Sequence, residues 1–172
     1  SGSLFDAHGR ILRVIRAPEA PAFRSLLDSE AVRSLVEKGA LVGTRSVAAA
    51  DVPDSLRGES GEWFEHDRVG FVSVPTEWSA AMLAHAAIHT LDVNQALLRH
   101  GYQLKDATPA NILFDGGRPL LVDVPSIERL QPGQNLWLAR HQFETTFLLP
   151  LLACLDLGYP IQWSLADPAR GL

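Results

Sequence analysis

Residues 104–123, Leu-Lys-Asp-Ala-Thr-Pro-Ala-Asn-Ile-Leu-Phe-Asp-Gly-Gly-Arg-Pro-Leu-Leu-Val-Asp, decide how the rest of the sequence is interpreted. The stretch opens with a polar loop that holds Asp106 and Asn111. Two short apolar runs follow, joined by the turn residues 115–118, and this pattern predicts a hairpin. Asp123 stands at the end of the second run. A tight hairpin brings the end of its second strand beside the start of its first strand. We therefore expect Asp106, Asn111 and Asp123 to converge.

Side chains of this kind, in this order, suit phosphoryl transfer. That chemistry needs a carboxylate to orient the attacking group and oxygen ligands to hold Mg²⁺ against the phosphates. The alternative is a chance set of turn residues, because Asp, Asn and Pro all favour turns. In that case Asp106 would satisfy backbone N–H groups of the loop and Asp123 would cap a turn.

A long helix is expected before the loop. Thr76 is the expected N-cap, and Gly101 ends a helix that reaches Arg99. At about 100° per residue, two opposite faces emerge: Leu83, Ala87, Leu91 and Leu98 on one, and His85, His89, Asp92 and Arg99 on the other. His85 and His89 have the spacing of a zinc pair, but the Glu of the metalloprotease motif is missing, so we favour a solvated polar face.

The other segments predict an α+β fold. The expected elements are strands at 10–16, 41–47 and 68–74, helices at 21–38 and 137–155, and an exposed connection over 48–65. The last helix should bury a stripe of Phe143, Phe147, Leu151 and Leu155. We expect a small α/β segment over residues 1–67 and a larger part over 68–172, together one compact unit.

The composition narrows the classes of protein. The 172 residues suit a single compact domain. With 15 Lys and Arg against 20 Asp and Glu, the formal net charge of −5 disfavours nucleic acid as a partner. Cys154 is the single cysteine, which fits a reducing cytoplasm. The longest apolar stretch, 147–155, is too short to cross a bilayer and predicts a buried helix. We therefore expect a cytoplasmic protein with no membrane partner.

The order of helix, polar loop, hairpin and aspartate resembles the catalytic half of the protein-kinase-like superfamily. The resemblance implies a compact, degenerate kinase-like fold with a reduced N-terminal lobe and a mainly helical C-terminal lobe. It also implies that Asp106 is catalytic, that Asn111 and Asp123 hold Mg²⁺, and that the ligand is ATP or another nucleotide. Lys105 is a candidate phosphate contact and Glu77 a candidate ligand anchor. Each also has an ordinary explanation, as an exposed lysine and as a carboxylate at a helix start.

The resemblance covers roughly residues 68–130, and the sequence departs from the kinase pattern around it. No glycine-rich loop occurs before residue 68, and neither Lys38 nor Lys105 lies in an expected strand. Val124 and Pro125 stand where kinases have Phe and Gly, and the proline indicates a fixed loop. These departures weigh against phosphotransfer and indicate a pseudokinase-like protein.

A more specific resemblance is to a bacterial segment that precedes class I SAM-dependent methyltransferase domains. It rests on blocks at Phe71–Ser79, Leu104–Asn111, Arg118, Pro119, Asp123, Ser126, Glu128, Arg140–Phe143 and Phe147–Leu151. The glycine-rich turn that would hold SAM is missing from the sequence, so SAM is expected only in a separate domain. The resemblance implies an ancillary domain whose partner is a methyltransferase domain, in cis or in trans.

Together these patterns predict an ancillary, pseudokinase-like domain that is associated with a methyltransferase and binds a nucleotide or phosphate ligand with Mg²⁺. Two alternatives stay open. One is an active small-molecule phosphotransferase, and the other is a purely structural protein-interaction module. Whether the chain is an enzyme therefore remains an open question at the level of sequence.

Overall fold

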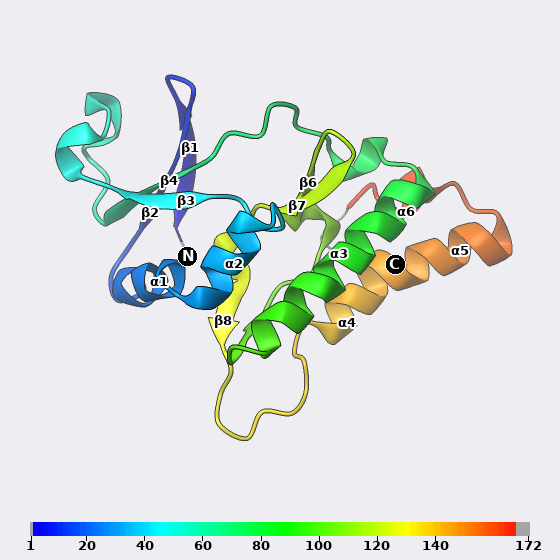
Figure 1. The fold of residues 1–172 in the computed structure, drawn as a ribbon. Coiled ribbons are helices and arrows are strands. Elements are labelled where there is room, and N and C mark those ends of the chain that lie inside the picture. Colours follow the sequence, from blue (N-terminus) through cyan, green and yellow to red (C-terminus); the bar gives the residue numbers. More distant parts are fainter. Residues whose placement is uncertain (1, 168–172) are drawn as a thin grey trace. The chain divides into compact units, whose positions relative to one another are not determined.

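A four-stranded antiparallel sheet organises the first 68 residues (Figure 1). Its strands are β1 (Ser3–Ala7), β2 (Arg10–Ile15), β3 (Thr44–Val47) and β4 (Glu62–His66), in the order β1-β2-β4-β3. His8 and Gly9, with φ of 52° and 79°, form the turn between β1 and β2, because tight hairpin turns need left-handed residues. The structure is a computed structural model and describes residues 2–167.

One face of this sheet is covered by the connection between β3 and β4. Val14 and Trp63 form a buried cluster there with Val52. Val52 lies between two short 3₁₀ turns, η1 (Ala49–Asp51) and η2 (Asp54–Leu56). The connection was expected to be exposed, yet it contributes to the core because it carries apolar side chains back over the sheet.

Two helices, α1 (Ala20–Leu27) and α2 (Glu30–Glu37), follow β2 in the same unit. The ring of Phe23 packs edge-on against Phe64 of β4, with 4.8 Å between the ring centroids. Ser29 separates the helices, since its extended backbone ends the first one and its hydroxyl caps the second. The single helix expected over 21–38 is therefore two helices.

The strands of this unit differ from expectation in three respects. The strand expected at 68–74 is wrong: β4 occupies residues 62–66, and Phe71 and Val72 are exposed in an irregular segment. Strand β1 was not predicted. The arginines of β2 alternate with apolar residues, a pattern typical of an exposed edge strand, yet β2 lies between β1 and β4. Pairing between distant segments decides these positions, and local composition does not reveal it.

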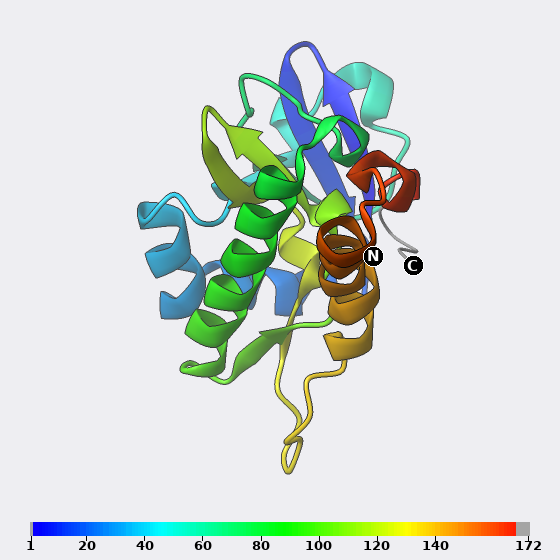
Figure 2. The ribbon, with the colours of Figure 1, turned by 90° about the vertical axis from the view of Figure 1, so that its right-hand side faces the viewer.

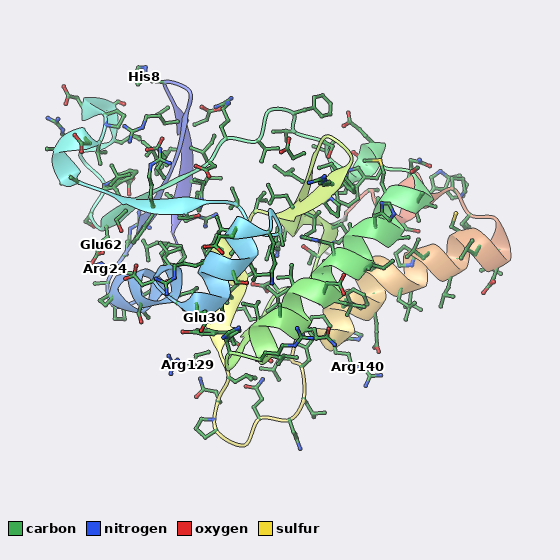
Figure 3. The ribbon with its side chains drawn as sticks, in the orientation of Figure 1. His8, Arg24, Glu30, Glu62, Arg129 and Arg140 are labelled. Atoms are coloured by element: carbon green, nitrogen blue, oxygen red, sulfur yellow. The ribbon has the colours of Figure 1, made fainter. Side chains whose placement is uncertain are left out.

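Three arginines of this unit are paired with carboxylates of β4. Arg10 and Arg45 bind Glu65 at N···O distances of 2.7 and 3.1 Å. Arg24 binds Glu62 at 2.5 Å, and Figure 3 shows these two side chains together. The pKa of Glu65 is lowered, chiefly by the hydrogen bond from Arg10. The positive charges of this segment are therefore balanced locally.

A second compact unit begins at Val69. This part was expected from the sequence to start one residue earlier, at residue 68. Its longest helix is α3 (Ala80–Leu98). The helix begins at Ser79, whose hydroxyl accepts a hydrogen bond from the N–H of Met82 at 3.3 Å. The expected start at Thr76 falls instead in a separate 3₁₀ turn, η3 (Pro75–Glu77).

Short strands and a second helical run complete the unit, giving an α+β fold with small antiparallel sheets. The strands are β5 (Tyr102–Leu104), β6 (Ile112–Asp115), β7 (Arg118–Leu121) and β8 (Ile127–Arg129), paired as β5 with β8 and β6 with β7. The helical run consists of α4 (Arg140–Phe143), a π-helical turn η6 (Glu144–Leu148), and α5 (Leu149–Leu157), followed by the short α6 (Ile161–Ser164). Figure 2 shows α3 and α5 side by side.

The buried face of α3 differs from the expected one. Leu91 and Leu98, expected to face the core, are each 43% exposed. The buried side chains are Leu83, Ala86, Ala87, Thr90, Val93, Asn94 and Leu97. Two of them are polar and hydrogen-bonded, since Thr90 donates to the Ala86 carbonyl and Asn94 accepts from the Leu104 N–H, each at 2.8 Å.

The final helical run is only partly buried. Phe147 is fully buried as expected, but Leu151 is half-buried and Leu155 is 76% exposed. The π-helical turn before α5 explains this, because its wider turn rotates the following residues relative to an α-helical stripe. Among residues 2–167, every helix is too short or too polar to cross a membrane.

A buried histidine joins three strands of the N-terminal sheet. His66 is 5% exposed and stands opposite Ile11 on one neighbouring strand and Thr44 on the other. Arg13 Nε donates to His66 Nε2 at 3.2 Å, so that nitrogen accepts and the ring proton belongs on Nδ1, 2.8 Å from Thr44 Oγ1. Burial lowers the pKa of His66 to about 4, helped by the positive charge of Arg13.

We expect the free energy of unfolding to fall as the pH drops, because His66 takes up a proton more readily when unfolded. The stabilisation is complete above the unfolded pKa near 6.5 and is lost toward the folded pKa of about 4. Between roughly pH 7.5 and pH 5 the loss should be about 2 kcal/mol, measured by urea unfolding. The H66Q variant should lack this dependence, and an unchanged slope in H66Q would contradict the assignment.

Candidate functional site

The loop that carries Asp106 and Asn111 follows β5 and ends in a 3₁₀ turn, η4 (Pro109–Asn111). The Asn111 N–H donates to the Thr108 carbonyl at 3.1 Å. Asn111 Nδ2 makes a long hydrogen bond of 3.5 Å to the Asp106 carbonyl. This bond uses the amide nitrogen of Asn111 and ties its side chain to the backbone of Asp106. Both site residues are partly exposed.

The register of the β6–β7 hairpin places Asp123 beside Asn111. Ile112 pairs with Leu121 in the ladder. The Val122 N–H donates to the Asn111 carbonyl at 2.9 Å and extends the ladder by one pair. Asp123 is the next residue, so its backbone lies next to that of Asn111. The hairpin thus brings the backbones of these two residues together, while the convergence of their side chains stays a prediction.

A turn after Asp123 connects this hairpin to β5. The turn is η5 (Val124–Ser126), in which the N–H and hydroxyl of Ser126 donate to the Asp123 carbonyl at 3.0 and 2.6 Å. The Lys105 N–H donates to the Ser126 carbonyl at 2.8 Å. Asp106 follows Lys105 in the chain. Hydrogen bonds and short stretches of backbone therefore connect Asp106, Asn111 and Asp123 in a closed ring of contacts, which we call the circuit.

The entry to the loop is fixed by side chains from two other segments. The Leu104 N–H donates to Asn94 Oδ1 of α3 at 2.8 Å. The Leu104 carbonyl accepts from Trp137 Nε1 at 2.6 Å. Leu104 itself is fully buried. Both backbone groups of this residue are therefore satisfied, and the chain leaves β5 in a defined direction.

The residue after Asp106 is held by the final helical run. The Ala107 N–H donates to Gln142 Oε1 at 2.6 Å, and the Ala107 carbonyl accepts from Thr146 Oγ1 at 3.2 Å. The same Thr146 hydroxyl lies 2.8 Å from the Gln142 carbonyl. Thr146 belongs to η6, and such π-helical turns occur frequently at functional sites. Gln142 and Thr146 thus form a clamp on the backbone next to Asp106.

Four residues that hold the loop were not predicted from the sequence: Asn94, Trp137, Gln142 and Thr146. Asn94 offered a signal, because an amide on the buried face of a helix needs a partner. The side chains of Thr145 and Thr146 both bond to carbonyls of the preceding turn, and paired threonines within an apolar helix point to such bonds.

Two further predicted site residues lie in the same unit. Lys105 is exposed immediately before Asp106. Glu77 is also exposed, and its carboxylate accepts from the Val74 N–H at 3.3 Å within η3. That bond fits the role of a carboxylate at the start of a helical segment. Lys105 therefore lies next to Asp106 in the circuit. The carboxylate of Glu77 is hydrogen-bonded within the turn η3.

Glu128 lies on a strand, although its neighbours Ser126 and Arg129 are typical of a capped turn or a surface ion pair. The residue is half-buried on β8 and accepts from Gln103 Nε2 of β5 at 2.8 Å, because the register sets the two opposite each other. Arg129, labelled in Figure 3, turns instead to Tyr102, with its guanidinium 5.4 Å from the ring centre. Glu128 therefore supports the β5–β8 pair.

A metal site needs several ligand side chains that lie close together. Among residues 2–167, three or more His, Cys, Asp or Glu side chains nowhere form a group that could hold a metal ion. The histidines His85 and His89 with Asp92 thus form no such centre. The three predicted site residues offer two carboxylates and one amide oxygen, and oxygen donors of this kind suit Mg²⁺ rather than zinc. The donor chemistry therefore fits the expected cation.

Comparisons with known proteins give a similar curated protein and similar solved structures. No family model matches the sequence. The nodulation protein NoeA of Rhizobium meliloti (strain 1021) is 36% identical over 152 residues, which are 88% of this chain and 31% of that protein. The chain thus spans about a third of the length of this relative. The PAN3 pseudokinase of Drosophila melanogaster is 16% identical, with a TM-score of 0.41, over 94% of this chain and 46% of that one.

Replacing Gln142 with Met should release the Ala107 amide, because Met has similar volume and no strong acceptor. A buried N–H left unpaired costs about 1–3 kcal/mol. We expect exchange of the Ala107 amide hydrogen to accelerate about tenfold or more, as measured by NMR. Q142E keeps an acceptor oxygen and should restore slow exchange, and Q95M on the exposed side of α3 is the control. Slow exchange in Q142M would disprove the clamp.

Proposed function

We propose that the unit beginning at Val69 binds a Mg²⁺–nucleotide or a related phosphate ligand, as an ancillary kinase-like domain that works beside a SAM-dependent methyltransferase domain. The observation that carries the proposal is the circuit through Asp106, Asn111 and Asp123. Turn residues gathered by chance need not be joined to one another. Here hydrogen bonds made by Asn111 Nδ2, Val122 and Ser126 connect the segments that carry all three residues, which supports a common site.

In this proposal Asn111 Oδ1 and the Asp123 carboxylate hold the cation, which neutralises charge on the phosphates when bound. Asp106 orients a polar group of the ligand or of an acceptor. Lys105 contacts a phosphate from the exposed side of the loop. Glu77 stays a predicted ligand anchor, and its bond to Val74 favours the capping role.

Ligand binding without efficient transfer fits the sequence better than catalysis. The strand lysine and the glycine-rich loop of kinases are missing from the sequence. The turn after Asp123 is compact, with Val124 fully buried and Ser126 bonded back to Asp123. A segment held in this way does not offer the movable backbone that kinases use after their metal-binding aspartate.

A protein-interaction module is the second candidate. The specific observation in its favour is the exposure of apolar side chains on α5, of which Leu155 and Leu157 are 76% and 71% exposed. The association with a methyltransferase domain rests on the sequence blocks described above. The similar NoeA protein is about three times longer than the matched region, so in that protein the region stands within a longer chain.

Titration with MgATP tests the ligand site. At about 1 mM ligand, the chain should gain about 1 kcal/mol of stability, or several degrees in Tm, for a Kd near 0.1 mM. D123A should abolish the part of the shift that depends on Mg²⁺. D115A removes the same charge from the exposed tip of the hairpin and is the control.

Two results would overturn the proposed ligand site. One is an unchanged Tm of the wild-type chain with MgATP, MgADP and inorganic phosphate. The other is an equal shift in D123A and D115A, which would place the ligand elsewhere. Transfer of labelled phosphate that is lost in D106N would favour the phosphotransferase alternative.

A further inference from the structure

Helix α5 is apolar on nearly every side, yet one side is open. Eight of its nine residues, Leu-Pro-Leu-Leu-Ala-Cys-Leu-Asp-Leu, are apolar, with Asp156 the exception. A helix that is apolar all round is normally buried. Here only Pro150 is fully buried, while Leu152 and Leu155 are 42% and 76% exposed.

Four exposed leucines of η6 and α5 share one side of the helical run, while Leu157, 71% exposed, faces another side at its end. Leu148, Leu152 and Leu155 follow one another at spacings of four and three residues, which places them on one face. Leu149 lies beside these three leucines. Asp156 follows Leu149 by seven residues, or two helical turns, and therefore lies on the same edge of the helix as Leu149. We name Leu148, Leu149, Leu152 and Leu155 the leucine stripe. This spacing is the one by which a helix packs into an apolar groove.

Aromatic side chains extend the apolar surface beyond the end of α5. Tyr159 and Trp163 contact each other with 6.0 Å between ring centroids. They are 48% and 69% exposed. Leucine, tyrosine and tryptophan exposed together are characteristic of protein contact surfaces.

The charges around the stripe indicate the chemistry of what covers it. From residue 141 to residue 167 the sequence has no Lys or Arg, while Asp156 and Asp167 are exposed carboxylates. A helix that lies on an anionic membrane carries Lys or Arg on its polar side. A second copy would bring another Asp156 and another net charge of −5 to the same surface. Both occupants are disfavoured by charge.

We propose that the leucine stripe docks into an apolar groove on a different protein domain, and that Lys or Arg at the rim of this groove faces Asp156. The apolar contact supplies the affinity, and the rim charges orient the helix and exclude like-charged partners. This surface is separate from the proposed ligand site, so either can exist without the other.

The probe is a pair of synthetic amphipathic helices of roughly 18 residues, with Leu on one face and either Lys or Glu on the other. The full chain should bind the Lys peptide about tenfold or more tightly than the Glu peptide, by fluorescence anisotropy. The double variant L152S/L155S should lose that binding by about tenfold or more. L91S/L98S removes two leucines of α3 that are each 43% exposed, close to the 42% of Leu152, and should bind like the wild type.

Four outcomes would overturn the proposal. Equal binding of both peptides, or equal losses in the α5 and α3 variants, would show only non-specific adhesion. A dimer seen by sedimentation and abolished by L152S/L155S would assign the stripe to a second copy. Binding to vesicles of phosphatidylcholine and phosphatidylserine that the same variant abolishes would assign it to a membrane. Unchanged MgATP binding in L152S/L155S would confirm that the two sites are separate.

Discussion

The backbone around Asp106 depends on hydrogen bonds that come from outside its own loop. Asn94 and Trp137 fix the residue before the loop, and Gln142 and Thr146 hold the residue after Asp106. The loop has no large apolar side chain, so directional bonds to a buried framework fix its backbone. The position of Asp106 is therefore a property of α3 and of the final helical run as much as of the loop.

A second constraint is the register of the β6–β7 hairpin. The bond between the Val122 N–H and the Asn111 carbonyl determines that Asp123 follows directly beside Asn111. A shift of one residue in the ladder would turn every side chain of the strand to the opposite face. The loop and the hairpin thus impose separate conditions on the site, and Asn111 is the residue where both meet.

Local patterns in the sequence predicted the parts of the fold that local chemistry determines. Loop, hairpin and the approach of Asp106, Asn111 and Asp123 follow from turn residues and short spacings. Strand β4 at 62–66 was misplaced, because it exists through pairing with β2 and β3 from distant segments. The buried face of α3 was also misassigned, since Asn94 is buried to meet the Leu104 N–H. Such demands arise only when segments far apart in sequence meet.

The expectation of a buried last helix was half correct, and the reason connects the two candidate functions. The run from Arg140 to Leu157 is helical throughout, with the π-helical turn in its middle. Gln142 and Thr146 near its start hold Ala107, while the leucine stripe lies in its later part. A helix transmits a displacement along its axis better than a loop does. A domain bound at the stripe would therefore rest on the same element that positions Asp106, so partner binding and ligand binding need not be alternatives.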